Sequence, residues 1–470
     1  MMLVLPLAIA WIGAVAIAIL DGRRRWVGWL AVACLAGSLA ALVVLGVEVF
    51  DGGARQIVAG GWEPGVGIVI HADALGVVFA ILSIGVLLAA LIYEVLGGVR
   101  SRSFPALILF MATGLIGLFL TGDIFNFYVF FEIAMISAYA LTGYGEERRQ
   151  WRAASIFAIV NLLGSVLFLI AIAALYHLTG RLDMFGVGQR AQVVAENPAI
   201  QVATLIFIAF CVKLGLFPFH FWLPAVYTST RPAVAAILGG ALANIGSYGL
   251  LRFGAGILPR ELELGAPALY ALGATSIIYG AMQALSRHSV SEVIAYSAIG
   301  QVGYIMLALA IGGQVGLTAA VLYAIVNAMN KTLLFLSENL RGWLVGAAFV
   351  VGAFSVAGVP PAAGFFGKAA MFRAGITEES VGGSVALVVL IFAGGLLSFV
   401  YMFQIYQARF WTKEAPADAT TPVAAGPPSQ VARRAVVVMV ALVVLAAGIW
   451  PEPLLAVSER AAQALGGGAS

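Results

Sequence analysis

The chain has 470 residues, of which 62% are hydrophobic and only 10% are charged, and its net charge is +3. This composition excludes a soluble globular protein, because the long apolar runs must be solvated by lipid. The small net charge provides no electrostatic footprint for binding nucleic acid.

The apolar runs are continuous and about 18 to 28 residues long, which is enough for a helix to cross a hydrocarbon core of roughly 30 Å. A β-barrel would show shorter segments of alternating polarity instead. We therefore predict an all-α polytopic membrane protein with about 14 transmembrane helices. In chain order the predicted spans are residues 2–20, 26–49, 69–96, 104–121, 124–143, 153–178, 200–222, 232–253, 266–285, 292–311, 315–338, 343–373, 384–411 and 431–450.

Basic residues in the loops predict the orientation. The first span has no basic residue before it and is followed by Arg23, Arg24 and Arg25, so we expect a retained helix rather than a cleaved signal peptide. Other arginines, such as Arg100 and Arg102, fall on the same face. The positive-inside rule makes this face cytoplasmic, and an even number of spans places both termini outside. We expect a multi-pass protein of the bacterial cytoplasmic (inner) membrane.

Residues 1–470 are expected to form a single membrane domain. A stretch rich in Pro, Ala, Thr and Gly before the last span predicts a flexible cytoplasmic linker. Helices 1 to 3 are expected over residues 1–103, a first repeat over 104–253 and a second repeat over 266–411. The linker is expected over 412–430, and the last helix with its tail over 431–470.

Three of the four lysines, Lys213, Lys331 and Lys368, lie inside apolar spans, as does Glu132. A charged group at membrane depth costs roughly 2.5 to 3.5 kcal/mol on insertion scales, so such groups usually face a protein interior or a water-filled path. The pattern is typical of an ion or proton conductor.

The fifth span begins at Asp123, which we expect to cap the helix. Glu132 follows nine residues later and should lie roughly 13 Å further in, near the middle of the bilayer. Buried lysines are available as its partners. The alternative is a Glu132 carboxyl that is neutralised by protonation or by a neighbouring hydroxyl.

Two spans carry both a lysine and helix-breaking residues. In the seventh, Pro218 follows Lys213 by five residues and should break the helix near residues 214–217, with His220 in the broken segment. His220 could assist proton entry or simply bind freed backbone. In the twelfth, Pro360 and Pro361 precede Lys368. We therefore predict two inverted five-helix repeats, helices 4–8 and 9–13, with helices 7 and 12 broken.

In the eleventh span, Asn327, Lys331 and Glu338 share one helical face. Lys331 and Glu338 would lie about 10 Å apart along the axis, so coupling between them would need water. In the eighth span the polar residue is Asn244. Taken alone, Asn244 is best explained by an interhelical hydrogen bond.

Four motifs together resemble the antiporter-like subunits of the Mrp and complex I superfamily, and most of all the D-type subunits of the Mrp sodium/proton antiporters. The similarity covers nearly the whole chain in order. One motif reads Gly-Asp-Ile-Phe-Asn-Phe-Tyr-Val-Phe-Phe-Glu over residues 122–132, and the others occupy residues 213–224, 294–304 and 358–368.

The resemblance implies that Glu132 pairs with Lys213 and that Lys331 and Lys368 continue the proton pathway. The chain departs from the family pattern at two relay positions, where Asn244 replaces a lysine or histidine and Asn327 replaces a histidine. An amide can order water but cannot hold and release a proton near neutral pH.

We therefore expect a transporter subunit, not an enzyme: the proton- and cation-translocating subunit of a multisubunit Na⁺/H⁺ antiporter, which uses buried charges and ordered water. Asn244, Asn327, His220 and Glu338 are candidate pathway-lining residues. We expect no cofactor or metal, and as partners other membrane subunits, protons, Na⁺ and the bilayer. Two alternatives remain: a proton-pumping subunit in the membrane arm of a complex I-like or hydrogenase redox complex, and a non-conducting scaffold.

Overall fold

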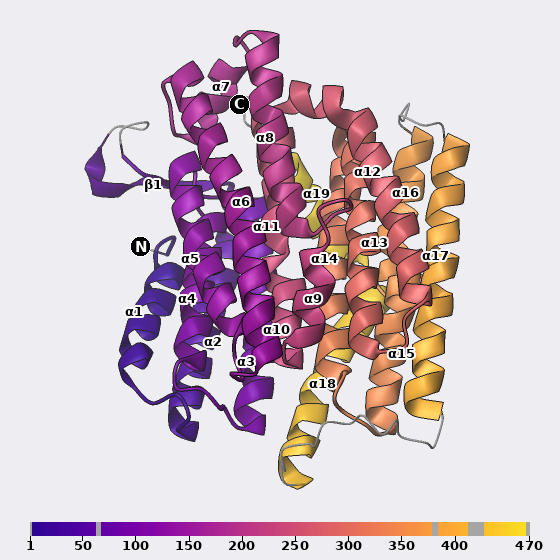
Figure 1. The fold of residues 1–470 in the computed structure, drawn as a ribbon. Coiled ribbons are helices and arrows are strands. Elements are labelled where there is room, and N and C mark those ends of the chain that lie inside the picture. Colours follow the sequence, from indigo (N-terminus) through magenta and orange to yellow (C-terminus); the bar gives the residue numbers. More distant parts are fainter. Residues whose placement is uncertain (1, 63–66, 378–383, 412–426, 467–470) are drawn as a thin grey trace.

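Long helices run side by side through the computed structural model (Figure 1). The structure describes residues 2–62, 67–377, 384–411 and 427–466. Most of the predicted linker 412–430 therefore lies outside the described residues.

The chain opens with four helices and a small β-hairpin. The third span was expected to begin at residue 69, but residues 69–72 form strand β2 and the helix begins only at Ala74. The predicted start of this span is therefore wrong. Val69 and Ile70 pair with Val58 and Ile57 in an antiparallel ladder, which suits β-branched residues. These elements are α1 (Leu5–Ile19), α2 (Arg25–Gly52), β1 (Arg55–Val58), β2 (Val69–Ala72), α3 (Ala74–Gly97) and α4 (Phe104–Phe119).

The next helices contain the first predicted break. Asp123 caps α5, since its carboxylate accepts a hydrogen bond from the Asn126 amide at 2.7 Å, as expected. The seventh predicted span is broken as predicted, because α8 ends at Leu214 and α9 begins at Trp222. The elements are α5 (Ile124–Thr142), α6 (Arg148–Thr179), α7 (Met184–Ala191), α8 (Glu196–Leu214) and α9 (Trp222–Ser229).

The eighth predicted span is one continuous helical segment with two π-helical stretches. It consists of α10 (Pro232–Ile237), a π stretch (Leu238–Leu242), α11 (Asn244–Gly249) and a second π stretch (Leu250–Ile257). In the first π stretch, Gly240 lies directly against Thr332 and Ala328 of the eleventh span. Only a residue without a side chain permits this approach.

The second half repeats the break. The twelfth predicted span is divided between α15 and α16, as the two prolines predicted. The elements are α12 (Pro259–Leu285), α13 (Val290–Ile311), α14 (Gly313–Ser337), α15 (Trp343–Ala357), α16 (Gly364–Thr377), α17 (Ser384–Tyr406, continued by a π stretch, Gln407–Trp411), α18 (Pro427–Ile449) and α19 (Glu452–Gly466).

The predicted C-terminal tail is itself the helix α19, which packs against α3 and α14. Its inner face carries Ser458, Ala461, Ala462 and Leu465, whereas its outer face is polar. Sequence reasoning missed this short amphipathic helix because it is far too polar to count as a span.

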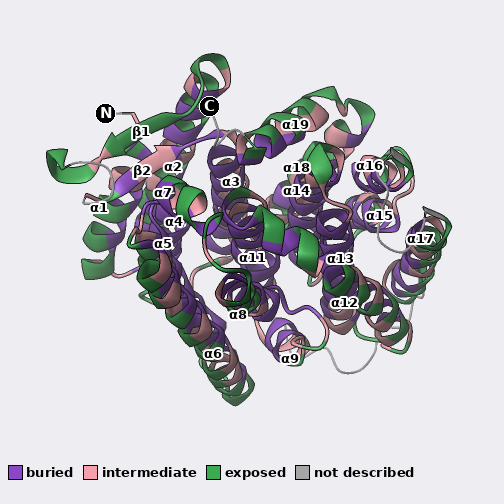
Figure 2. Cartoon of the chain, turned by 90° about the horizontal axis from the view of Figure 1, so that it is seen from above, coloured by how far each residue is buried: buried purple, intermediate pink, exposed green. Residues whose placement is uncertain are grey.

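Burial separates central helices from peripheral ones. In the most apolar window of Pro232–Ile257 and of Gly313–Ser337, 94% of residues are buried, against 39% in Arg148–Thr179 and 28% in Ser429–Ile449. The view along the helices shows the same division, with α11, α13 and α14 in the middle and α6 and α17 at the rim (Figure 2). Any charge on the central helices is therefore shielded from lipid by protein.

Within the described residues, eleven helices are long and apolar enough to cross a membrane. Three further predicted spans correspond to shorter apolar helices, Leu5–Ile19, Phe104–Phe119 and Trp343–Ala357. The number of fourteen transmembrane helices thus stays a prediction, whereas the polytopic all-helical architecture is confirmed.

Helices α12 and α13 pack closely against each other in the second half. A Cβ atom added to Gly303 would lie 2.5 Å from the Gly273 carbonyl oxygen and 3.1 Å from the Ile277 nitrogen. By contrast, a Cβ added to Gly85 in α3 would meet nothing within 4 Å.

These two glycines allow a matched test of that contact. Alanine usually stabilises a helix interior by roughly 0.5–1 kcal/mol over glycine. We expect Gly85→Ala to keep or raise the apparent unfolding temperature in detergent, whereas Gly303→Ala lowers it because backbone atoms cannot move aside cheaply. An equal response of the two variants would contradict the close packing of α12 on α13.

Candidate functional site

The three lysines predicted to lie inside the membrane are all buried. Their exposed fractions are 8% for Lys213, 0% for Lys331 and 5% for Lys368. Each ammonium therefore depends on the protein for its hydrogen-bond acceptors, since a buried charge without partners is very costly.

Lys213 lies at the C-terminal end of α8 and reaches across to α6. Its Nζ donates to the Asn161 carbonyl oxygen at 2.8 Å and to Ser165 Oγ at 3.1 Å. The same Nζ lies 4.3 Å from the centre of the Phe131 ring on α5. Backbone, hydroxyl and aromatic groups thus surround the charge.

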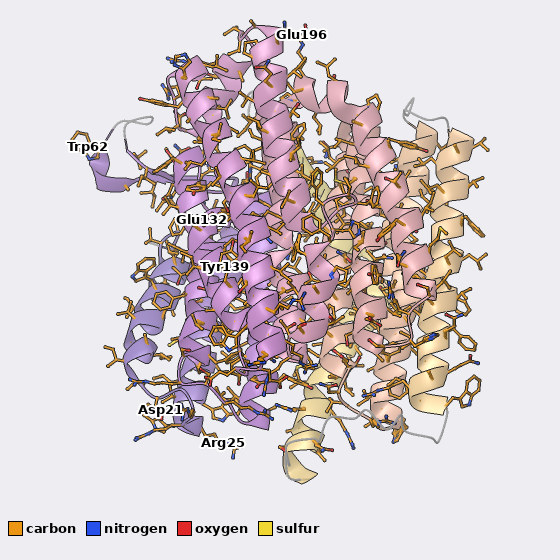
Figure 3. The ribbon with its side chains drawn as sticks, in the orientation of Figure 1. Asp21, Arg25, Trp62, Glu132, Tyr139 and Glu196 are labelled. Atoms are coloured by element: carbon orange, nitrogen blue, oxygen red, sulfur yellow. The ribbon has the colours of Figure 1, made fainter. Side chains whose placement is uncertain are left out.

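The direct ion pair expected between Glu132 and Lys213 is not formed among the described residues. Glu132 follows Phe131 in α5, so the helix turns the ring, not the carboxylate, onto the ammonium. One carboxylate oxygen, Oε1, is buried without a hydrogen-bond partner. Glu132 lies near mid-height of the molecule, on the same helix as Tyr139 (Figure 3).

The break that follows Lys213 is bound to the second half of the chain. Gly215 adopts a left-handed conformation with φ of 67°, and the Phe217 amide donates to Ser276 Oγ on α12 at 3.1 Å. The His220 ring lies against Phe217 and Tyr279. His220 Nδ1 is buried without a hydrogen-bond partner, so this candidate residue has a free polar atom inside the break.

Lys331 lies in the C-terminal third of α14 and donates to α13. Its acceptors are Ser297 Oγ at 3.2 Å and the Ile294 carbonyl oxygen at 3.5 Å. The candidate residue Asn327 lies one turn earlier in α14, and its Oδ1 is also buried without a partner.

Lys368 uses the carbonyl groups that the second break sets free. Its Nζ donates to the Ala357 oxygen at 2.9 Å and to the Val356 oxygen at 3.1 Å, at the end of α15. Such terminal carbonyls have no partner within their own helix. Gly358 has φ of 80°, and a Cβ there would meet Lys368 Cδ at 2.6 Å, so glycine is required on both counts.

Two further candidate residues lie away from this line of lysines. Asn244 donates to Ser83 Oγ on α3 at 3.0 Å and to the Gly240 oxygen at 2.9 Å, which confirms the interhelical hydrogen bond considered for it. Glu338 follows the end of α14, where Ser291 Oγ donates to its carboxylate. Burial raises the pKa of Glu338 above its ordinary value despite the Ser291 and Arg409 contacts.

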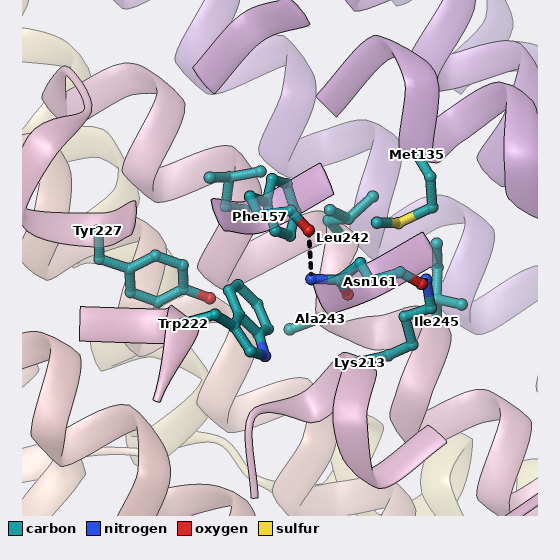
Figure 4. Close-up of a pocket in the computed structure, with 10 residues that line it drawn as sticks. Met135, Phe157, Asn161, Lys213, Trp222, Tyr227, Leu242, Ala243 and Ile245 are labelled. Atoms are coloured by element: carbon teal, nitrogen blue, oxygen red, sulfur yellow. Dashed lines mark hydrogen bonds between the residues drawn. The ribbon is translucent and has the colours of Figure 1, made fainter. Parts of the chain in front are cut away.

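A small cavity of about 10 Å³ adjoins Lys213, close to the size of a single water molecule. Its lining includes Asn161, Lys213, Trp222 and Tyr227 (Figure 4). Tyr227 also packs against Phe335 of α14, with ring centres 5.3 Å apart. Sequence reasoning missed Tyr227, because a tyrosine in an apolar segment usually packs in the core.

Buried ion pairs hold both ends of the bundle. At one end Glu94 of α3 accepts from Tyr144 at 2.9 Å and lies 3.4 Å from Arg231 and 3.6 Å from Arg433. Glu94 could have been singled out as a carboxylate inside the third predicted span.

At the other end Asp73 pairs with Arg252 at 2.7 Å. Burial alone would raise the pKa of Asp73, but Arg252, His71 and the Gly76 amide hold it well below its usual range. Arg252 lies near the end of the eighth span and is largely buried in this pair. Among the residues that the structure describes, no three His, Cys, Asp or Glu side chains gather as metal ligands would.

Comparisons with known proteins agree on one family. A family model described as "NADH:quinone oxidoreductase/Mrp antiporter, TM" matches residues 121–342. The chain is 30% identical to the D-type subunit of the Na(+)/H(+) antiporter of Alkalihalophilus pseudofirmus over 402 residues, which covers 80% of each protein. It is also 30% identical to the antiporter subunit of the same name from Bacillus subtilis over 404 residues, with 81% of each covered.

Solved structures share the fold. A chain of the Mrp complex from Dietzia sp. superposes with a TM-score of 0.88 at 24% identity, over 99% of this chain and 97% of that one. A chain of respiratory complex I from Thermus thermophilus superposes with a TM-score of 0.76 at 26% identity, over 96% and 98% of the two chains.

Two serines of α6 test whether Lys213 depends on its hydroxyl partner. Ser165 and Ser155 each donate at 3.0 Å to the carbonyl four residues earlier, but Ser165 alone of the two also accepts from Lys213. A hydrogen bond to a charged group is worth about 1.5–3 kcal/mol. We expect Ser165→Ala to lower the apparent unfolding temperature in detergent, while the exposed Ser155→Ala leaves it nearly unchanged. Equal unfolding temperatures would show that the ammonium does not need this hydroxyl.

Proposed function

The chain belongs to the NADH:quinone oxidoreductase/Mrp antiporter family, and we propose that it is the proton- and cation-translocating D-type subunit of a multisubunit Na⁺/H⁺ antiporter. The observation that carries this proposal is the set of three buried lysines. Within the described structure, each is hydrogen-bonded by neutral acceptors and none by a carboxylate. Such sites hold an ammonium without locking it into an ion pair.

The proton-translocating step follows from that solvation. A carbonyl or hydroxyl acceptor stabilises the ammonium far less than a direct carboxylate would, so the free-energy difference between charged and neutral lysine stays small enough to be shifted. Glu132 supplies an electrostatic bias on Lys213 from beyond contact distance. One elementary charge crossing 100 mV is worth about 2.3 kcal/mol, which is the scale of driving force available.

Transfer from Lys213 towards Lys331 would pass Tyr227. The cavity beside Lys213 reaches Tyr227, and a Cβ on Gly239 would lie 3.6 Å from Tyr227 Cε2 and 3.4 Å from Lys331 Cβ. Phe335 Cε2 lies 3.2 Å from the same position, so Gly239 packs against Tyr227, Phe335 and the base of the Lys331 side chain together. Asn244 faces α3 instead, so in this proposal it supports packing and does not carry the proton.

We further propose that the end of the bundle carrying Arg23, Arg24 and Arg25 faces the cytoplasm and that both termini lie outside. Asp21 and Arg25 lie at one end of the molecule and Glu196 at the other (Figure 3). The protein would lie in the bacterial cytoplasmic membrane, with other membrane subunits of the antiporter beside it. The apolar rim helices α6, α17 and α18, exposed in the isolated chain, would be covered by lipid or by those subunits.

A subunit of a redox complex is the second candidate function, because the complex I chain also shares the fold. The relatives at 30% identity favour the antiporter. Purification of the native complex distinguishes the two: small membrane subunits without redox centres support the antiporter, whereas flavin or iron–sulfur subunits support the redox complex. The third candidate, a non-conducting scaffold, is tested by the flux measurement below.

Removal of Lys213 should stop the coupled flux. In everted vesicles that carry the assembled complex, we expect Lys213→Ala to reduce Na⁺-dependent proton flux by about tenfold or more, as for other positioned proton-transfer groups. Pyranine fluorescence inside the vesicles would report the flux.

The control is Arg260→Ala, which removes a basic side chain that is 57% exposed and paired with Glu196 at one end of the bundle. It should leave the flux unchanged, because exposed pairs contribute little. Full flux in an assembled Lys213→Ala complex would reject the conducting role and favour the scaffold.

A further inference from the structure

A group of hydroxyl side chains from α13 and α17 fills the space between Lys331 and Lys368. Apart from Ser297, which accepts from Lys331, none of them is used in the pathway described above. They are Ser297 and Tyr304 on α13 and Ser398 and Tyr401 on α17, with Gln301 and Tyr323 beside them, and all are buried.

On the Lys331 side the hydroxyls form an unbroken chain. Lys331 Nζ donates to Ser297 Oγ at 3.2 Å, and the Tyr401 hydroxyl lies 3.0 Å from both Ser297 Oγ and Ser398 Oγ. Ser398 in turn donates to the Gly394 carbonyl oxygen at 2.6 Å. The chain therefore leads from the lysine to Gly394 without any water.

On the Lys368 side the chain resumes at the same glycine. The Tyr304 hydroxyl lies directly against Gly394, in the space that a Cβ would occupy there. A Cβ on the next residue, Gly395, would lie 3.3 Å from Lys368 Nζ, and this Nζ stands 4.8 Å from the centre of the Tyr304 ring. The two glycines thus leave room for the hydroxyl and the ammonium together.

The Tyr304 hydroxyl is buried without a hydrogen-bond partner. Burying an unpaired hydroxyl costs roughly 1–3 kcal/mol, and phenylalanine would fill the same volume without that cost. A structural role explains the ring but not the oxygen. Tyr323 donates to Gln301, and this pair packs beside the chain of hydroxyls.

We propose that Ser297, Tyr401, Ser398 and Tyr304 form a hydroxyl relay that carries protons between Lys331 and Lys368. The inference rests on the proposed function and extends its pathway from Lys331 to Lys368. One bridging water between Ser398 and Tyr304 would complete the path at Gly394.

Each step conserves atoms and charge. The Lys331 ammonium gives one proton to Ser297 Oγ while Ser297 gives its own proton to Tyr401. Tyr401, Ser398, the bridging water and Tyr304 each accept one proton and pass one on in the same way. The last proton passes from Tyr304 to the Lys368 amine, which becomes the ammonium. Every hydroxyl accepts one proton and donates one, so the relay is unchanged after the side chains rotate back.

Tyrosine-to-phenylalanine variants test the relay because they remove only the oxygen. In vesicles with the assembled complex, Tyr401→Phe and Tyr304→Phe should each lower Na⁺-dependent proton flux by about tenfold or more. The matched control is Tyr406→Phe on the same helix, whose ring packs against Phe410 and Trp411. It should keep full flux and the same solvent deuterium isotope effect as the unmodified complex.

Full flux in both assembled tyrosine variants would overturn the relay. If Tyr401→Phe prevents assembly, Ser398→Ala decides by the same criterion, with Ser398→Thr as the control that keeps a hydroxyl. Lys213→Ala in parallel vesicles separates the two proposals. Flux lost in Lys213→Ala but kept in the hydroxyl variants rejects the relay alone, whereas flux kept in Lys213→Ala rejects the proposed function itself.

Discussion

The structure depends on how an ammonium group is solvated inside a helical bundle that excludes bulk water. A regular helix uses its own carbonyl groups, so a broken helix or a serine that projects from a neighbour supplies the additional acceptors that a buried lysine needs. Lys368 takes the first route, with the carbonyls that end α15, and Lys331 takes the second, with Ser297. Lys213 combines a backbone carbonyl with Ser165. Neutral acceptors keep the charge in place but leave it free to be given up, which is what translocation requires.

The arrangement of the helices follows from the same requirement. Charged side chains lie on or face the central helices, where protein replaces lipid on all sides, and the rim helices carry apolar surface outward. The broken helices are closed by left-handed glycines, Gly215 and Gly358, which turn the chain sharply, and Gly358 also leaves space for Lys368. Ion pairs of Glu94 and Asp73 then hold α3 at its two ends, so the bundle is fixed outside the line of lysines and can change charge within it.

The sequence predicted the features that depend on strong local rules. Prolines after Lys213 and before Lys368 placed the two breaks correctly, and the cost of a buried charge singled out the three lysines. The direction in which a side chain points from its helix was missed, because it depends on how each helix is rotated about its own axis. The sequence cannot show that α5 presents Phe131 to Lys213 while Glu132 turns aside, or that Asn244 faces α3. The tyrosines Tyr227, Tyr304 and Tyr401 carry no signal of their own, because buried tyrosine is common and only the neighbours show which hydroxyl is unsatisfied. The hairpin was missed because its strands are short, and α19 was missed because it is too polar to count as a span.

The most direct test of the account is a cryo-EM map of the assembled complex at a resolution that shows ordered water. The account predicts water density beside Lys213 Nζ and Tyr227, and polar contacts that continue past Lys331 to Lys368, with each lysine still bound by carbonyl and hydroxyl oxygens. A site beside Lys213 Nζ and Tyr227 without water density, together with a Lys213 that is paired directly with the Glu132 carboxylate, would contradict it.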